Sequence, residues 1–141
     1  MTDASPRPPV LVAAAVLVEE GRVLLTQRKR GTHLAGAWEF PGGKVEPGED
    51  PRAALVRELV EEIGVEVSVG DPVEVTFHKY PEKSVLLLFF WVTRLPGSPD
   101  PRPLDVADVK WAGAGDLAPE LFPPADVAIL SKVRALLSPD T

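Results

Sequence analysis

One stretch constrains this chain more than any other: residues 39–65, which read EFPGGKVEPGEDPRAALVRELVEEIGV. Asp50 is a favourable N-cap, and Pro51 suits the first helical position because its missing N–H would have no helical partner there. Gly64 suits the end of a helix because glycine adopts the left-handed conformation without a steric penalty. The spacing therefore predicts a helix over about 51–63, preceded by a strand end, a glycine turn and a loop.

The predicted helix has two different faces when its residues are placed about 100° apart. The apolar face carries Leu55, Val56, Leu59, Val60 and Ile63. The opposite face carries Glu58, Glu61 and Glu62, and neighbouring carboxylates on a helix repel one another at neutral pH. Either water and salt screen this acidic face, or a divalent cation binds among its carboxylates.

The glycine turn before the helix favours the cation. Gly42 and Gly43 let a ligand approach the backbone closely. Oxygen ligands with no Cys or His nearby favour a hard ion, Mg2+ or Mn2+, and such ions bind phosphate oxygens and activate water. Lys44 and Arg57 add positive charge beside the carboxylates. The combination indicates a site for a polyphosphate that is bridged by metal.

Composition excludes several other classes of protein. The net charge of −6 disfavours non-specific binding to a nucleic acid polymer. The absence of cysteine excludes a disulfide framework and a thiolate zinc site. No apolar run reaches the roughly 18 residues of a membrane span, and the polar N-terminus does not have the pattern of a signal peptide. We expect a soluble, cytoplasmic protein that has no membrane partner and is a monomer or a homodimer.

The rest of the chain predicts strands around two helices. Strands are expected over 10–18, 22–28, 38–40, 66–69, 73–80, 85–92 and 108–111. The first is almost wholly apolar and should be buried on both faces, whereas PGSPDPRP at 96–103 should be an exposed loop. A short turn or helix follows at 115–121 and a final helix at about 124–137. This order predicts a single α/β domain over 9–139, behind a disordered lead at 1–8.

Nine positions of the opening stretch follow the spacing G-x5-E-x7-R-E-U-x-E-E-x-G-U, in which U is apolar. They are Gly43, Glu49, Arg57, Glu58, Leu59, Glu61, Glu62, Gly64 and Val65. This pattern resembles the signature of the Nudix hydrolase family at every position. The segments WEFPGGK and LFPPAD resemble the branch that cleaves nucleoside triphosphates, similar to the MutT-type 8-oxo-dGTP diphosphatases and the CTP pyrophosphohydrolases. The resemblance implies a Nudix-type α/β/α sandwich with a mixed β-sheet between helices.

The resemblance also implies roles for the carboxylates. Glu61, Glu62 and the Gly42 carbonyl would hold Mg2+ or Mn2+, and Glu58 would be a further ligand or the base that activates water. Arg57 would orient Glu58. Metals held by clustered carboxylates would neutralise phosphate oxygens and supply the activated water.

Two further acidic positions follow from the same resemblance. Glu49 would brace the loop before the helix without taking part in the chemistry. Asp105, six residues before Trp111, lies where this branch often has one more acidic metal ligand, with Asp108 as the rival position.

Substrate-binding positions are implied as well, and they lie far apart in the sequence. They are Arg28, His33, Phe40, Lys44, Tyr80 and Asp126. Structural alternatives stay open for several of them, because Arg28 could end a strand, His33 could be an ordinary loop residue and Phe40 could belong to the core. Lys44 adjoins the glycine turn.

Asp126 bears on the choice of base. In 8-oxo-dGTP enzymes of the MutT type, this position resembles one held by asparagine, which both donates and accepts hydrogen bonds, whereas ionised aspartate only accepts. An aspartate would favour a base edge rich in N–H groups, such as the amine of cytosine or the N1–H and N2–H2 edge of guanine. Alternatively, Asp126 is a helix N-terminal residue favoured by the macrodipole.

The resemblance therefore implies a Mg2+-dependent enzyme that converts a nucleoside triphosphate to the monophosphate and pyrophosphate. Its substrate would be a small nucleotide such as 8-oxo-dGTP or a (d)CTP-like molecule, in keeping with a role in nucleotide-pool sanitising. Two alternatives remain: a sugar-nucleotide or dinucleotide diphosphatase with the same signature, and a nucleotide-binding module without catalysis.

Overall fold

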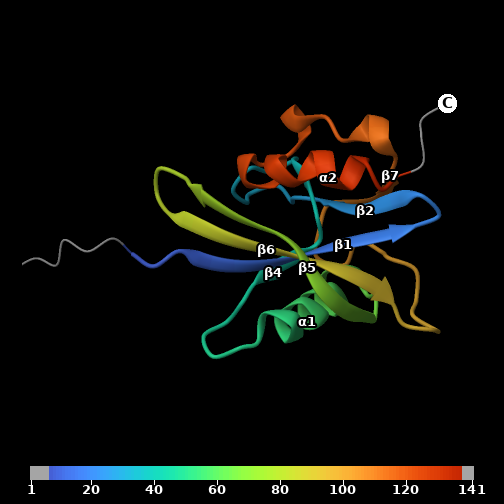
Figure 1. Ribbon diagram of the computed structural model, residues 1–141. Coiled ribbons are helices and arrows are strands. Elements are labelled where there is room, and N and C mark those ends of the chain that lie inside the picture. The colour runs from blue at the N-terminus through green and yellow to red at the C-terminus, as the bar shows by residue number, and fades with distance from the viewer. Residues whose placement is uncertain (1–6, 138–141) are drawn as a thin grey trace, which may run out of the picture.

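The strands of the protein form one mixed sheet, seen in a computed structural model that describes residues 7–137 (Figure 1). The strands are β1 (Val10–Glu19), β2 (Arg22–Gln27), β3 (Trp38–Glu39), β4 (Gly42–Lys44), β5 (Val67–Lys79), β6 (Ser84–Arg94) and β7 (Asp108–Ala112). Their order is β3-β2-β1-β6-β5, while β4 pairs with β1 and β7 pairs with β2. Only β1 and β6 run parallel within this set, so the predicted mixed sheet is confirmed.

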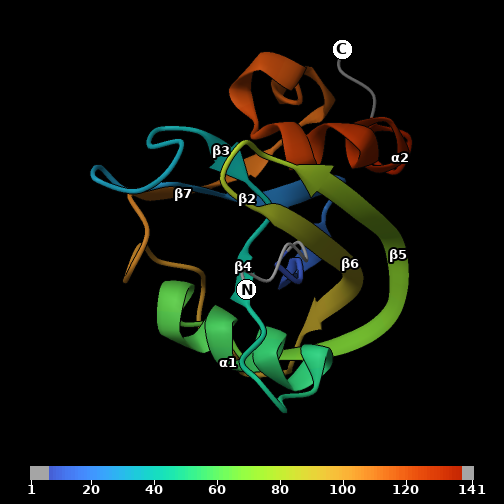
Figure 2. The ribbon, with the colours of Figure 1, turned by 90° about the vertical axis from the view of Figure 1, so that its left-hand side faces the viewer.

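Strand β1 lies at the centre and is buried on both faces, as its apolar sequence predicts. Ala13, Ala15 and Leu17 pack into the core beneath α1 (Pro51–Ile63). Ala14 and Val16 pack on the opposite face, beneath the 3-10 helix η3 (Pro124–Ile129) and α2 (Leu130–Arg134). Figures 1 and 2 show helices on both sides of the sheet, which confirms the α/β/α sandwich. Within residues 7–137, no helix has both the length and the apolar character that a membrane crossing requires.

Helix α1 begins and ends where its sequence predicts. The Asp50 carboxylate accepts a hydrogen bond from the Arg52 N–H at 2.8 Å, and Gly64 closes the helix with φ of 71°. The apolar face is narrower than expected, since Val56 and Val60 are 37% and 46% exposed. The buried residues Ala54, Leu55, Leu59 and Ile63 fix the helix against the sheet. This orientation turns part of the acidic face towards β4.

Three expected elements differ from the structure. The glycine turn is the short strand β4, because its backbone pairs with Ala13 and Ala14 of β1. The two strands expected at 66–69 and 73–80 form the single strand β5. Its pairing register with β6 shifts around Pro72, where a break between two strands was expected.

The expected helix over 124–137 is the third correction. It is divided into η3 and the five-residue α2, with the Asp126 N–H bonded to the Pro123 carbonyl in the tighter 3-10 winding. This winding turns Ala125, Asp126 and Ile129 inward. The region expected to hold a short turn or helix carries two 3-10 turns, η1 (Ala114–Asp116) and η2 (Pro119–Leu121).

The ends of the predicted domain are only partly described. Arg7 and Pro8 are exposed and irregular, while residues 1–6 of the expected lead lie outside the described residues. The same holds for residues 138 and 139 at the end of the expected domain.

Candidate active site

A cavity of about 390 Å³ opens between β1, β3, β4 and η3. One end is lined by the β4 glycines together with Glu58 and Glu62 of α1. The other end is lined by side chains from four separate segments, which are Arg28, Phe40, Tyr80 and Asp126. The two ends thus differ in chemistry: the first is rich in oxygen atoms, and the second combines aromatic and charged side chains.

Strand β4 can occupy its place only because it consists largely of glycine. A Cβ on Gly42 would lie 2.0 Å from the Ala13 carbonyl oxygen, and a Cβ on Gly43 would lie 2.4 Å from the Glu58 carboxyl carbon. The strand therefore packs closely against both β1 and the Glu58 side chain. This contact brings backbone groups and a carboxylate to one wall of the cavity.

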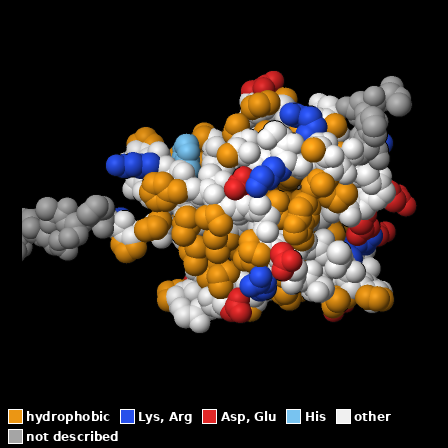
Figure 3. Space-filling view, in the orientation of Figure 1, with side chains coloured by type: hydrophobic (Ala, Val, Ile, Leu, Met, Phe, Trp, Pro, Cys, Tyr) orange, Lys and Arg blue, Asp and Glu red, His pale blue; other side chains and the backbone are white. Residues whose placement is uncertain are grey.

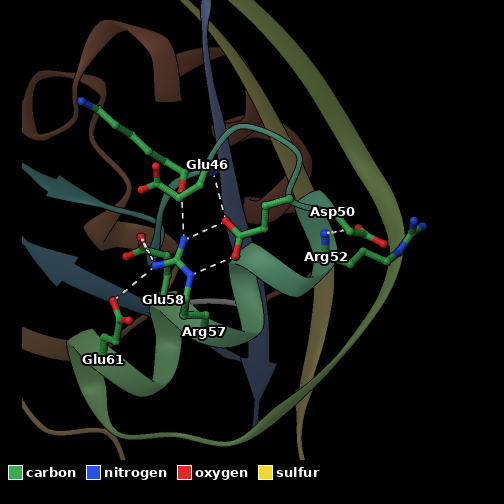
Figure 4. Close-up of polar contacts among 8 residues, drawn as sticks. Glu46, Asp50, Arg52, Arg57, Glu58 and Glu61 are labelled. Carbon is green, nitrogen blue, oxygen red and sulfur yellow. Dashed lines mark hydrogen bonds and ion pairs between the residues drawn. The ribbon is translucent and has the colours of Figure 1, made fainter.

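Arg57 holds this end of the site in position (Figure 4). Its guanidinium donates two hydrogen bonds to Glu49, both at 2.9 Å, and one to the Glu58 carboxylate at 3.0 Å. It also reaches the Lys44 carbonyl at 3.3 Å. Hydrogen bonding to Arg57, and then to the Glu46 N–H, lowers the pKa of Glu49 to about 2. The geometry agrees with the orienting role expected of Arg57 and the bracing role expected of Glu49.

Glu58, which pairs with Arg57, and Glu62 lie close together in a poorly solvated place. Burial is the main cause that raises the pKa of Glu58 above its usual range. Burial, and then the charge of Glu58, raise the pKa of Glu62 to about 8. Two crowded carboxylates beside backbone oxygens form an oxygen-only set of donors, which fits a hard divalent cation.

The other acidic residues expected to bind metal lie outside the cavity. Glu61 is 56% exposed and pairs with Arg57 at 3.3 Å. The Asp105 N–H donates to the Glu62 carbonyl at 3.0 Å, which keeps its loop at the end of α1, but its side chain pairs with Lys29. Across residues 7–137, no three His, Cys, Asp or Glu side chains are arranged as a metal site. Binding at Glu61 or Asp105 would therefore require side-chain rotation.

Asp108, the rival of Asp105, makes a local contact instead. Its carboxylate accepts a hydrogen bond from the Val109 N–H at 2.8 Å. Asp108 does not line the cavity.

The far end of the cavity is built around Arg28. The Arg28 guanidinium donates to Glu39 at 2.9 Å and to the His33 carbonyl at 2.6 Å, so it is held from two sides. Tyr80 accepts a hydrogen bond from the Ala125 N–H at 3.4 Å and lies edge-on to His33. These contacts join the residues that directly follow β2 and β5 to η3 around one opening.

Asp126 is 5% exposed at this end of the cavity. Burial, and then the charge of Glu39, raise the pKa of Asp126 well above its ordinary value, while the Phe40 N–H and Arg28 act in the opposite direction. A protonated carboxyl both donates and accepts hydrogen bonds, whereas the ionised form only accepts. In its protonated form, Asp126 would therefore donate as well as accept, unlike the ionised aspartate expected from the sequence.

Most of the residues expected in the site line this one cavity. These are Arg28, His33, Phe40, Gly42, Lys44, Glu58, Glu62, Tyr80 and Asp126. Arg57, Glu61 and Asp105 do not line it. Sequence reasoning missed Glu39, although a charged residue inside the short apolar run Trp38-Glu39-Phe40 was a signal that could have indicated it.

Known proteins resemble the chain in both sequence and structure. The NUDIX domain family matches residues 7–133. The 8-oxo-dGTP diphosphatase of Escherichia coli (strain K12) is 33% identical over 118 residues, 84% of this chain and 90% of that protein. The CTP pyrophosphohydrolase of the same organism is 55% identical over 60 residues, 43% of this chain and 44% of that protein.

Two solved structures extend the likeness to the whole fold. The E. coli ORF135 protein superposes with a TM-score of 0.74 at 35% identity, covering 90% of this chain and 89% of that one. A MutT Nudix hydrolase from Burkholderia pseudomallei gives 0.75 at 28% identity, with 90% and 99% covered. Members of this family generally use a divalent metal, in keeping with the oxygen donors of the cavity. The chain belongs to the Nudix family and is a hydrolase that acts on phosphoric anhydrides.

Proposed function

We propose that the protein is a Mg2+-dependent pyrophosphohydrolase of nucleoside triphosphates, with 8-oxo-dGTP and (d)CTP-like nucleotides as its substrate class. One observation carries this proposal: a single cavity of about 390 Å³ joins the Glu58–Glu62 carboxylates to a buried end that holds Asp126. The first end suits the phosphates and the second suits a base. The names of the relatives support the same substrates.

At the phosphate end, Glu62 and the Gly42 carbonyl would hold the cation, and Glu61 and Asp105 would join after side-chain rotation. The cation would neutralise phosphate oxygens and favour deprotonation of the attacking water. Glu58 would take the proton of that water, because Arg57 fixes its carboxylate at 3.0 Å and β4 packs against it. The water oxygen bonds to phosphorus as the bridging P–O bond breaks, which releases the monophosphate and pyrophosphate.

At the base end, the chain supplies an aromatic wall and fixed hydrogen-bonding groups. Phe40 and Tyr80 would contact the base or sugar, and Lys44 and His33 would contact the polar parts of the nucleotide. Arg28 is preorganised by Glu39 and the His33 carbonyl, so its remaining N–H groups are available to substrate. Asp126, when protonated, would present one donor and one acceptor to the base, which suits both oxidised guanine and cytosine.

A substrate panel tests this proposal. Purified protein with Mg2+ is incubated with 8-oxo-dGTP, dGTP, dCTP, 5-methyl-dCTP, CTP and ADP-ribose, and products are separated by ion-exchange chromatography. We expect a monophosphate and pyrophosphate from at least one oxidised-guanine or cytosine triphosphate, with kcat/KM well above that for ADP-ribose. Turnover of ADP-ribose with no triphosphate cleaved would reject the proposal.

A further inference from the structure

An exposed apolar patch lies on the sheet beside α1. Val75 and Phe77 of β5 are 55% and 60% exposed. Phe77 lies opposite Leu86, which in turn lies opposite Leu11. Val75 lies opposite Leu88 in the neighbouring row. In Figure 3, apolar side chains gather over this part of β5 and β6. A contiguous patch of this kind is typical of a surface that contacts another protein.

The strand that carries the patch is also the open edge of the sheet. Among residues 7–137, β5 pairs only with β6. In an antiparallel pair, the backbone groups of alternate residues point to the partner and away from it. The Tyr80 N–H donates to the Lys83 carbonyl across the hairpin, so the even-numbered residues of this part of β5 face β6. The Val73 carbonyl, at an odd-numbered position, accepts a hydrogen bond from the Lys132 side chain at 3.2 Å and not from β6. The odd-numbered residues Val75 and Phe77 therefore direct their N–H and carbonyl groups outward.

The sequence of this edge is complementary to itself. An antiparallel pairing centred on Thr76 places Val75 opposite Phe77 of a second copy, and Phe77 opposite Val75. Both residues of each pair have outward-pointing backbone groups, so the register forms complete hydrogen-bonded pairs. Glu74 then lies opposite His78, whose ring N–H can donate a hydrogen bond to a carboxylate. We propose that two copies of this chain form a homodimer through antiparallel pairing of their β5 strands about Thr76.

Neighbouring features limit the extent of this pairing. The Lys132 side chain donates a hydrogen bond to the Val73 carbonyl, which therefore does not extend the pairing, and forms an ion pair with Glu74 at 3.3 Å. The irregular register around Pro72 keeps the first part of β5 from pairing regularly. The contact is therefore short, at the low end of protein interfaces, and its dimer dissociates on dilution. This inference does not depend on the substrate proposed above.

Sedimentation velocity over a range from micromolar to millimolar protein tests the dimer. We expect the average mass of the unaltered protein to rise from monomer towards dimer as concentration increases. Phe77→Lys should abolish this rise, because it places a charge in the centre of the patch. Leu121→Lys is the matched control, since Leu121 is 42% exposed and lies in η2; it should associate like the unaltered protein. Circular dichroism checks that both variants fold.

The register is tested by mixing two variants. In a homodimer of Val75→Glu, each new glutamate faces Phe77 of the other copy. In a homodimer of Phe77→Lys, each new lysine faces Val75 of the other copy. In the mixed dimer, the new glutamate faces the new lysine, and the other pair remains Val75 with Phe77. Native mass spectrometry should show the mixed dimer in excess over either homodimer.

Three results would overturn the proposal. The first is an unaltered protein that stays monomeric at the highest concentration. The second is a Phe77→Lys variant that associates as strongly as the Leu121→Lys control. The third is a mixture without an excess of the mixed dimer, which would reject the register.

Discussion

The two ends of the cavity are built in different ways. The phosphate end comes from one contiguous stretch, in which β4, the loop with Glu49 and helix α1 follow one another. The base end is assembled from Arg28, Glu39, Tyr80 and Asp126, which belong to four separate segments. The first end is held by the local Arg57 network, whereas the second depends on the packing of η3 against β5. We therefore expect a substitution near α1 to impair the phosphate end selectively. The base end should instead depend on how the distant segments pack together.

The largest expected effect concerns the phosphate end. Glu58→Gln should lower kcat by roughly a hundred- to ten-thousand-fold, because the amide cannot accept the proton of the attacking water. Glu120→Gln, an exposed change in η2, is the control and should leave kcat unchanged. Steady-state kinetics on the best substrate provides the measurement. A Glu58→Gln enzyme with the rate of the control would show that this end does not perform the chemistry.

A smaller loss is expected where β4 contacts Glu58. Gly43→Ala should lower kcat by up to about a hundredfold, because the added Cβ displaces the Glu58 carboxylate. In Gly70→Ala, by contrast, the new Cβ would have only an ordinary contact, 3.5 Å from the Trp91 carbonyl. Kinetics and thermal melting of both variants separate the two effects. Equal losses of activity would mean that the close approach of β4 is unimportant.

The Arg57 network should give an effect of about tenfold. Arg57→Lys keeps the charge but loses the paired hydrogen bonds to Glu49, so the loop at 45–50 should loosen. Hydrogen exchange of the Glu46 amide, which donates to Glu49 at 3.0 Å, should become faster as kcat/KM falls.

Arg94→Lys is the matched control for this variant. Arg94 makes a similar pair with Glu19 at 2.7 Å but does not line the cavity. The Arg94→Lys variant should lose stability but keep the kcat/KM of the unaltered protein. If Arg57→Lys lost stability alone, the network would be structural only.

The smallest effect on kcat is expected at the base end, where the main readouts are selectivity and stability. Folding raises the pKa of Asp126 above its ordinary value of 3.8, so the folded state binds more protons than the unfolded state above that pH. The contribution of Asp126 to the stability of the unaltered protein is therefore lost progressively as pH rises from about 4. Asp126→Asn cannot ionise, so its melting temperature should exceed that of the unaltered protein by a few degrees at neutral pH.

The difference between the two melting temperatures should shrink as pH falls towards 4. Differential scanning calorimetry over this range measures it, and substrate ratios from the panel report the change in selectivity. A difference that does not vary with pH would show that Asp126 stays ionised in the folded protein.

The same contrast explains how much of the structure could be predicted. Helix α1, its caps and the position of Glu58 and Glu62 follow from residues close together in sequence, and the structure agrees with them. The sequence also predicted Asp126 at the base end, but only tertiary burial determines its protonation. Local rules failed where a distant partner changes the outcome, as when β1 draws the glycines of β4 into the sheet. Glu39 was missed because its importance arises from Arg28, eleven residues away.

The parallel pairing of β1 and β6 has a consequence for synthesis of the chain. Val10 to Leu17 pairs with Val85 to Val92, so the central strand lacks this neighbour until residues 85–92 have left the ribosome. During that interval the apolar residues of β1 are only partly buried, and contacts so distant in sequence form slowly. Strand β1, the earliest of the described strands, is thus among the last to be fully enclosed.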